Sequence, residues 1–191
     1  AISVGEIVSE NPFDVIGEYA NDQRLHMAYC FEFLSEDFNF SDTNKIVDQF
    51  FHNNPNSWPC WSFSNHDSMR ITSRINKSSK EIMKKLLELK GNICIYQGEE
   101  LGLHETEVKF EDLKDPFGKN FWPEFKGRDG CRTPMPWNSK KINLGFSNAK
   151  PWLPVNNAYA AKSAKQQQND PDSMLNYTKE LIKLRKKGYA A

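Results

Sequence analysis

The chain has 191 residues, of which 38% are hydrophobic and 26% are charged. This balance is typical of a globular domain with a sizeable core and excludes a disordered segment. Twenty-five basic side chains match twenty-five acidic ones, so composition indicates neither a nucleic-acid partner nor a membrane surface.

The four cysteines are Cys30, Cys60, Cys94 and Cys131, and their spacing fits neither a metal site nor a dense disulfide framework. We therefore expect free thiols in a reducing, cytoplasmic setting, with no metal ion and no cofactor. The chain begins at Ala1, without an initiator methionine, directly before an apolar segment of strand type. We expect it to be cut from a longer protein. The absence of a signal peptide from this sequence then says little about that longer protein.

Strand and helix patterns alternate along the first half of the chain. Short apolar and aromatic runs predict four strands, over residues 2–4, 25–33, 61–63 and 92–96. Between the first three, helical patterns cover residues 14–20 and 42–51. Four strands, each followed by a helix or a loop, make up half of an eightfold barrel.

The helix before the fourth strand has the clearest signals. Ser78 and Glu81 form a capping-box pattern, and apolar residues at 82, 83, 86 and 87 lie on one face. Gly91 follows, where a left-handed backbone ends a helix.

A long stretch rich in Pro, Gly, Trp and Asn then covers residues 103–165. It is too long to be a simple connecting loop without a function. A last helix is predicted over 170–187. Asp170 is expected to cap it, with Pro171 at its first position and Gly188 at its end.

Polar residues directly after the strands are the candidate site residues, because the chemistry of such barrels sits where strands end. Glu6 follows the first strand, where a carboxylate is well placed for general acid catalysis, although most such glutamates are ordinary surface residues. Asn65, His66 and Asp67 follow the third strand and offer groups for a polyhydroxylated ligand. By local pattern alone these three residues favour a plain turn.

Two arginines, Arg128 and Arg132, lie in one tight loop, Gly-Arg-Asp-Gly-Cys-Arg-Thr-Pro-Met-Pro-Trp at 127–137. Guanidinium groups in such a loop recognise carboxylates or hydroxyl groups. Alternatively they pin the loop to the barrel by salt bridges, which we expect of one of them.

Five segments together resemble the α-amylase family of glycoside hydrolases. Ser-Val-Gly-Glu-Ile at 3–7 is similar to the family's fifth-strand motif, Trp-Ser-Phe-Ser-Asn-His-Asp-Ser at 61–68 to the seventh, and the segment 92–102 to the eighth. The stretch 105–137 resembles a loop of bacterial α-glucosidases, and 170–187 resembles the helix that closes the barrel. The segments occur in family order along nearly the whole chain.

The resemblance implies that residues 1–191 are the C-terminal half of a TIM (β/α)8 catalytic barrel, strands five to eight with their helices. Glu6 then matches the acid/base and Asp67 the carboxylate that stabilises the transition state. His66 matches a histidine that contacts the sugar, and Asn65 is a further substrate contact. Arg128 matches an arginine that holds the terminal glucose, so we expect it beside Asp67, with Arg132 as a weaker candidate.

The implied activity is the retaining hydrolysis of terminal, non-reducing α-linked glucose from short, maltose-like α-glucosides. The family nucleophile lies in a Gly-Phe-Arg-x-Asp-Ala motif on the fourth strand, and this sequence has no such motif. We therefore expect the isolated chain to be inactive. We also expect it to need the N-terminal half of the barrel, or to self-associate through open strand edges.

Two alternatives come from other functional classes. The family fold also serves as a non-catalytic ectodomain in transporter heavy chains, and a half-barrel could act as a sugar-binding module. The presence of Glu6, His66 and Asp67 together favours an enzyme. The preference for α-1,4 or α-1,6 linkages, and for hydrolysis or transglycosylation, stays open.

Overall fold

The computed structural model describes residues 1–21, 23–35 and 37–189. The chain forms two compact units, one of residues 1–63 and 85–95, the other of residues 64–84 and 96–191.

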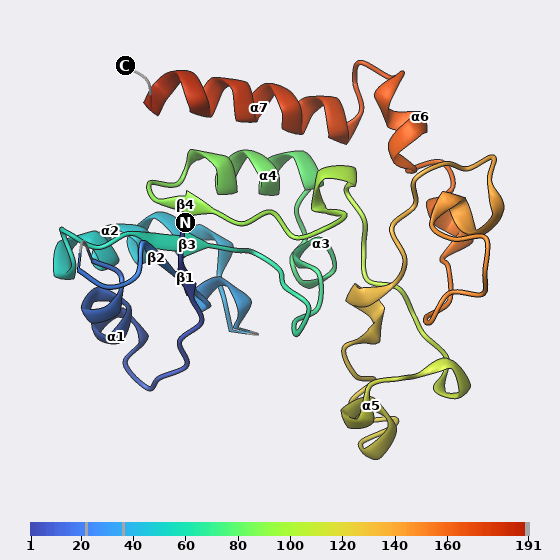
Figure 1. Cartoon of the computed structure of the whole chain (residues 1–191), viewed down its shortest axis with the longest axis horizontal. Coiled ribbons are helices and arrows are strands. Elements are labelled where there is room, and N and C mark those ends of the chain that lie inside the picture. Colours follow the sequence, from blue (N-terminus) through green and yellow to red (C-terminus); the bar gives the residue numbers. More distant parts are fainter. Residues whose placement is uncertain (22, 36, 190–191) are drawn as a thin grey trace. The chain divides into compact units, whose positions relative to one another are not determined.

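The first unit is built on a parallel sheet of four strands, paired in chain order (Figure 1). The strands are β1 (Val4–Gly5), β2 (Met27–Cys30), β3 (Pro59–Trp61) and β4 (Asn92–Ile93). The predicted α/β class with parallel strands is confirmed. The strands differ in their limits, because β2 stops before a 3₁₀ turn at Glu32–Leu34 and β3 begins two residues earlier than predicted.

Two helices make the crossovers between the first three strands. They are α1 (Pro12–Tyr19) and α2 (Thr43–Asn53), the latter after a 3₁₀ turn at Phe40–Asp42. Buried aromatic rings pack both α2 and the turn after β2 against the sheet: the centroids of Phe50 and Trp61 lie 5.6 Å apart, and those of Phe33 and Trp61 lie 5.1 Å apart. The Trp61 ring is buried, and its indole N–H donates a hydrogen bond to the carbonyl of Lys90 at 2.6 Å.

Helix α4 (Ser79–Glu88) begins with the predicted capping box. The Ser78 hydroxyl accepts from the Glu81 N–H at 3.2 Å, and the Glu81 carboxylate accepts from the Ser78 N–H at 3.0 Å. Gly91 follows with φ of +112°, and a Cβ there would lie 2.9 Å from the Trp61 indole nitrogen. Both the backbone angle and the lack of space therefore require glycine at this position.

The second unit contains α3 (Ile71–Arg74), α5 (Pro116–Asn120), α6 (Ala164–Gln168) and α7 (Met174–Tyr189). Its 3₁₀ turns lie at Glu99–Leu101, Phe110–Asp112, Asp129–Arg132, Ile142–Gly145 and Asn157–Tyr159. The long stretch predicted as a loop is thus a series of short turns around a core. Leu101, Leu103, Leu144 and Tyr159 form that core.

The predicted start of the last helix is wrong. Helix α7 begins at Met174, because the Ser173 hydroxyl accepts from the Asn176 N–H at 3.2 Å and caps it. Asp170, the predicted cap, instead accepts from the Asp172 N–H at 3.0 Å in a separate turn. Gly188 lies inside the helix, which ends at Tyr189.

Candidate active site

Asn65 builds the turn that follows β3 and carries the predicted site residues. Its side-chain oxygen accepts from the backbone N–H of Asp67 at 2.9 Å and from the hydroxyl of Ser68 at 3.0 Å. This is the local turn that the sequence pattern favours. The turn leaves the side chains of His66 and Asp67 exposed, so a structural role for Asn65 and a binding role for its neighbours are compatible.

The Asp67 carboxylate is held by both arginines of the loop. Its Oδ1 lies 2.7 Å from Nη2 of Arg132 and 3.1 Å from Nη1 of Arg128. Its Oδ2 faces Nε2 of His66 at 3.5 Å, and Nε of Arg132 donates to the His66 carbonyl at 2.6 Å. The structure thus brings four of the predicted residues into one cluster, with Arg128 beside Asp67 as expected.

Asp115 pairs with Arg128 and holds its guanidinium in place. The sequence analysis did not predict Asp115 as a site residue. The guanidinium forms a two-pronged pair, with Nε 2.9 Å from Oδ2 and Nη2 2.9 Å from Oδ1 of Asp115. The Asp115 side chain is fully buried. Hydrogen bonds from Arg128 hold the pKa of Asp115 well below its usual range, and Asp115 in turn raises the pKa of Arg128.

The sequence does contain a local signal for Asp115, because the pair Asp115-Pro116 marks the start of a helix. Its Oδ1 caps α5 by accepting from the Phe117 N–H at 3.2 Å. Asp129 supports the same corner, since its buried carboxylate accepts from the N–H groups of Lys114 and Asp115 at 2.6 and 2.8 Å.

Glu6 lies directly after β1, in the first unit, whereas the other predicted site residues belong to the second. Its side chain is exposed and is a minor cause of the raised pKa of Tyr29. That pKa reaches about 12, chiefly through the hydrogen bond of Tyr29 with Cys94 and through burial. The expected position of Glu6 at a strand tip is confirmed.

Two cavities of the second unit involve the arginine–aspartate cluster or its chain neighbours. One, of about 300 Å³, includes Arg132 among its lining residues, together with Phe146 and Trp152. The other, of about 270 Å³, is lined by Met69 and Gly127, near Asp67 and Arg128 in the chain. The first cavity therefore offers space for a small ligand beside Arg132.

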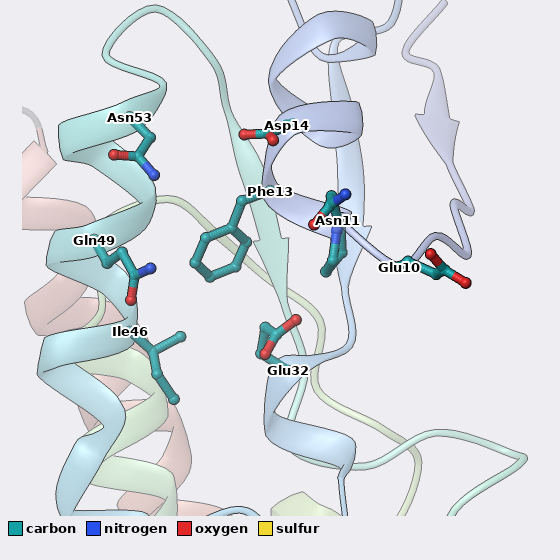
Figure 2. A pocket seen from close by; sticks show the side chains of 9 residues that line it. Glu10, Asn11, Phe13, Asp14, Glu32, Ile46, Gln49 and Asn53 are labelled. Atoms are coloured by element: carbon teal, nitrogen blue, oxygen red, sulfur yellow. The ribbon is translucent and has the colours of Figure 1, made fainter.

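A further cavity, of about 390 Å³, lies in the first unit between α1 and α2 (Figure 2). Figure 2 shows the Phe13 ring pointing into the space between the two helices. Carboxylates and amides surround it, but none of the predicted site residues lines it. The lining residues are Glu10, Asn11, Pro12, Phe13, Asp14, Glu32, Ile46, Gln49 and Asn53.

Glu99 is another residue that the sequence analysis did not predict as part of the site. It is a buried carboxyl next to the start of the turn that carries Asp67. It accepts from the Tyr96 N–H at 2.8 Å, and the Ser64 hydroxyl also contacts it. Burial raises its pKa to about 7, against the hydrogen bonds and the Arg70 cation, which lower it. In the folded protein this group therefore titrates near neutral pH.

The raised pKa predicts a specific pH dependence of stability. Because the folded state binds this proton more tightly than the unfolded state, stability is greatest below the ordinary pKa of 4.5 and falls as the pH rises to about 7. The free energy of unfolding should fall by up to about 3 kcal/mol across this range. Glu99→Gln should remove this fall. Urea unfolding at pH 5 and at pH 8 measures the free energy of unfolding of each variant. Glu124→Gln, an exposed control, should keep the original pH dependence, and an unchanged slope in Glu99→Gln would refute the assignment.

The described residues contain no group of three or more side chains placed to hold a metal ion. Within the same residues, no helix combines the length and the apolar character needed to cross a membrane. The four cysteines are all free.

Comparisons with known proteins identify the family. The α-amylase catalytic domain matches residues 1–191. The chain belongs to the α-amylase family. It is 41% identical to a probable α-glucosidase of Rhizobium meliloti, across 96% of this chain and 35% of that protein. It is 33% identical to a probable oligo-1,6-glucosidase of Bacillus subtilis, across 97% of this chain and 40% of that protein.

Solved structures of other enzymes have the same fold over nearly all of this chain. The α-glucosyl transfer enzyme XgtA superimposes with a TM-score of 0.90 at 43% identity, across 97% of this chain and 36% of that one. The trehalose-6-phosphate hydrolase of Bacillus licheniformis superimposes with a TM-score of 0.86 at 30% identity, across 98% of this chain and 40% of that one. The chain thus spans well under half the length of these relatives.

Proposed function

We propose that this chain is part of a retaining α-glucosidase that releases terminal, non-reducing α-linked glucose from short α-glucosides. The observation that carries the proposal is the pairing of Asp67 with Arg128 and Arg132 on one exposed surface. Fixed donors and acceptors of this kind suit sugar hydroxyl groups. Relatives named α-glucosidase and oligo-1,6-glucosidase support the same substrate class.

In this proposal the four strands are the fifth to eighth of the barrel, and residues 1–191 are the C-terminal half of the catalytic domain. Their parallel pairing in chain order supports this position. The edge strands β1 and β4 pair on one side only in the described residues, and Ile2 and Val8 beside β1 are exposed. The N-terminal half of the barrel would cover such edges, and self-association would cover them in an isolated chain.

Glu6 acts as the acid/base in the proposed mechanism. It donates its proton to the glycosidic oxygen as that bond breaks, and afterwards takes a proton from the attacking water. A retaining enzyme also needs a carboxylate nucleophile about 5–5.5 Å from the acid/base. We propose that this nucleophile comes from a segment outside these residues, so that the isolated chain does not turn over substrate.

Asp67 stabilises the distorted sugar ring in the transition state. Both arginines bind its Oδ1, which leaves Oδ2 to accept from sugar hydroxyls. Arg128 and Arg132 neutralise this carboxylate and offer further donors, and His66 lies beside Oδ2 as a second contact. Asn65 holds the turn with its side-chain oxygen, and its amide nitrogen donates to substrate.

A second candidate function is glucosyl transfer to an acceptor other than water. The similarity to an enzyme named for α-glucosyl transfer favours it. The two reactions share the same glucosyl intermediate, and differ in the group that attacks it. The four free cysteines support a reducing, cytoplasmic setting for either.

The proposal is tested by incubating the full-length protein with maltose and isomaltose and measuring free glucose. Release of glucose is expected from at least one of them, and Asp67→Asn should lower it strongly. An increase of oligosaccharide products at high substrate concentration would support transfer. Glucose binding without any turnover would instead identify a non-catalytic sugar-binding protein.

A further inference from the structure

Arg70 is a buried cation that joins three segments of the second unit. It is only 1% exposed. Its Nη1 donates to the Gln97 carbonyl at 2.7 Å and its Nη2 to the Cys131 carbonyl at 2.9 Å. Its backbone N–H donates to the carboxylate of Glu105 at 2.9 Å. One side chain therefore links the turn that carries Asp67, the segment after β4 and the arginine loop.

The carbonyl of Cys131 is the anchor of that loop. Besides Arg70, it accepts from the Tyr96 hydroxyl at 3.0 Å and from the Gln97 amide at 3.3 Å. The next residue in the chain is Arg132, which holds both the His66 carbonyl and the Asp67 carboxylate. Since Arg70 follows Asp67 by three residues, these contacts close a ring in which the carboxylate and its arginine fix each other's position.

We propose that Arg70 is a positioning residue, which sets the geometry of Asp67 against Arg132 by binding the Gln97 and Cys131 carbonyls with its two terminal nitrogens. The inference rests on the proposed function, because it assigns Arg70 an effect on the transition state through Asp67. Arg70 itself does not touch the sugar.

Arginine is needed because two carbonyls must be bound at once. Its planar fork presents two nitrogens in a fixed arrangement, whereas a lysine ammonium is a single point charge on a flexible stem. The cation is also neutralised in place: Arg70 lowers the pKa of Glu99, Glu100 and Glu105 against the burial that raises them. A substitution that keeps the charge therefore separates geometry from electrostatics.

Arg70→Lys in the full-length protein tests the proposal. We expect kcat/KM for an α-glucoside to fall about 10- to 100-fold, mostly in kcat, because small displacements of a group that acts in the transition state are costly. Arg24→Lys, an exposed control, should retain the original kcat/KM. Thermal unfolding of each variant shows whether it is folded.

A double-mutant cycle separates positioning from a purely structural role. If Arg70 acts through Arg132, then Arg70→Lys should cost much less in an Arg132→Ala background than in the unaltered protein. Equal losses in both backgrounds, or a lower melting temperature with unchanged kcat/KM, would overturn the proposal. Absence of glucose release by the unaltered protein would instead count against the proposed function.

Tyr96→Phe provides a milder probe if Arg70→Lys does not fold. It removes the hydroxyl that donates to the same Cys131 carbonyl and leaves Arg70 in place. A smaller loss in kcat, about 2- to 5-fold, is expected, and it too should shrink in the Arg132→Ala background. An unchanged kcat, or a loss of equal size in that background, would overturn the role assigned to this anchor.

Discussion

Glu6→Gln in the full-length protein is expected to lower the rate on maltose-like substrates by about 10²–10⁴-fold, the usual contribution of general acid catalysis. The amide keeps the shape of the side chain but cannot give a proton to the glycosidic oxygen. Binding of glucose should be mostly intact. Glu10→Gln, a substitution of an exposed glutamate four residues further on, should retain the original rate.

The choice of substrate distinguishes the role of Glu6 from that of Asp67. A nitrophenyl glucoside has a good leaving group that needs little protonation, so Glu6→Gln should slow its glycosylation step much less. Asp67→Asn should slow both substrates alike, because this residue acts on the sugar ring. If Glu6→Gln hydrolysed maltose near the original rate, Glu6 would not be the acid.

Asp115→Asn is expected to reduce the free energy of unfolding by about 2–4 kcal/mol at neutral pH, because it leaves the partly buried Arg128 without its two-pronged partner. The same change should lower kcat/KM, since Arg128 would no longer be held beside Asp67. Urea unfolding measures the first effect and steady-state kinetics the second.

The exposed pair of Lys126 and Glu107 is a matched control in the same loop. Its Nζ and carboxylate oxygen lie 2.7 Å apart, yet Glu107→Gln should change the free energy of unfolding far less than Asp115→Asn, because water screens the pair. The effect of Asp115 should also depend on pH. Its depressed pKa means that its stabilising contribution is present above the ordinary pKa of 3.8 and is lost as the pH falls below it. Equal effects of the two substitutions at neutral pH would contradict the role of Asp115.

Features that depend on neighbours in sequence could be predicted. The capping box of Ser78 and Glu81 and the strand-tip position of Glu6 each follow from a few adjacent residues. The proximity of Arg128 to Asp67 followed from the family resemblance. The limits of strands were less predictable, because the long apolar run at 25–33 continues from β2 into a turn without any change of composition.

Features that depend on the tertiary fold could not be predicted. In the sequence Asp115 shows only as a helix start and Arg70 as an ordinary charged residue, because their partners lie 13 and 61 residues away. Likewise, Ser173 caps α7 although Asp170-Pro171 is an equally good local signal, because Asp170 is used in its own turn. Tertiary packing determines which of two competing local signals is used, and the local sequence pattern does not reveal that packing.

The most direct test of the central claim is the anomeric form of the first glucose released by the full-length protein from an α-glucoside. Proton NMR distinguishes the two anomers before they interconvert. A retaining α-glucosidase, with Glu6 as acid/base and a covalent intermediate, releases α-glucose first. Initial release of β-glucose would contradict the account, because it requires direct attack by water and a different role for Glu6.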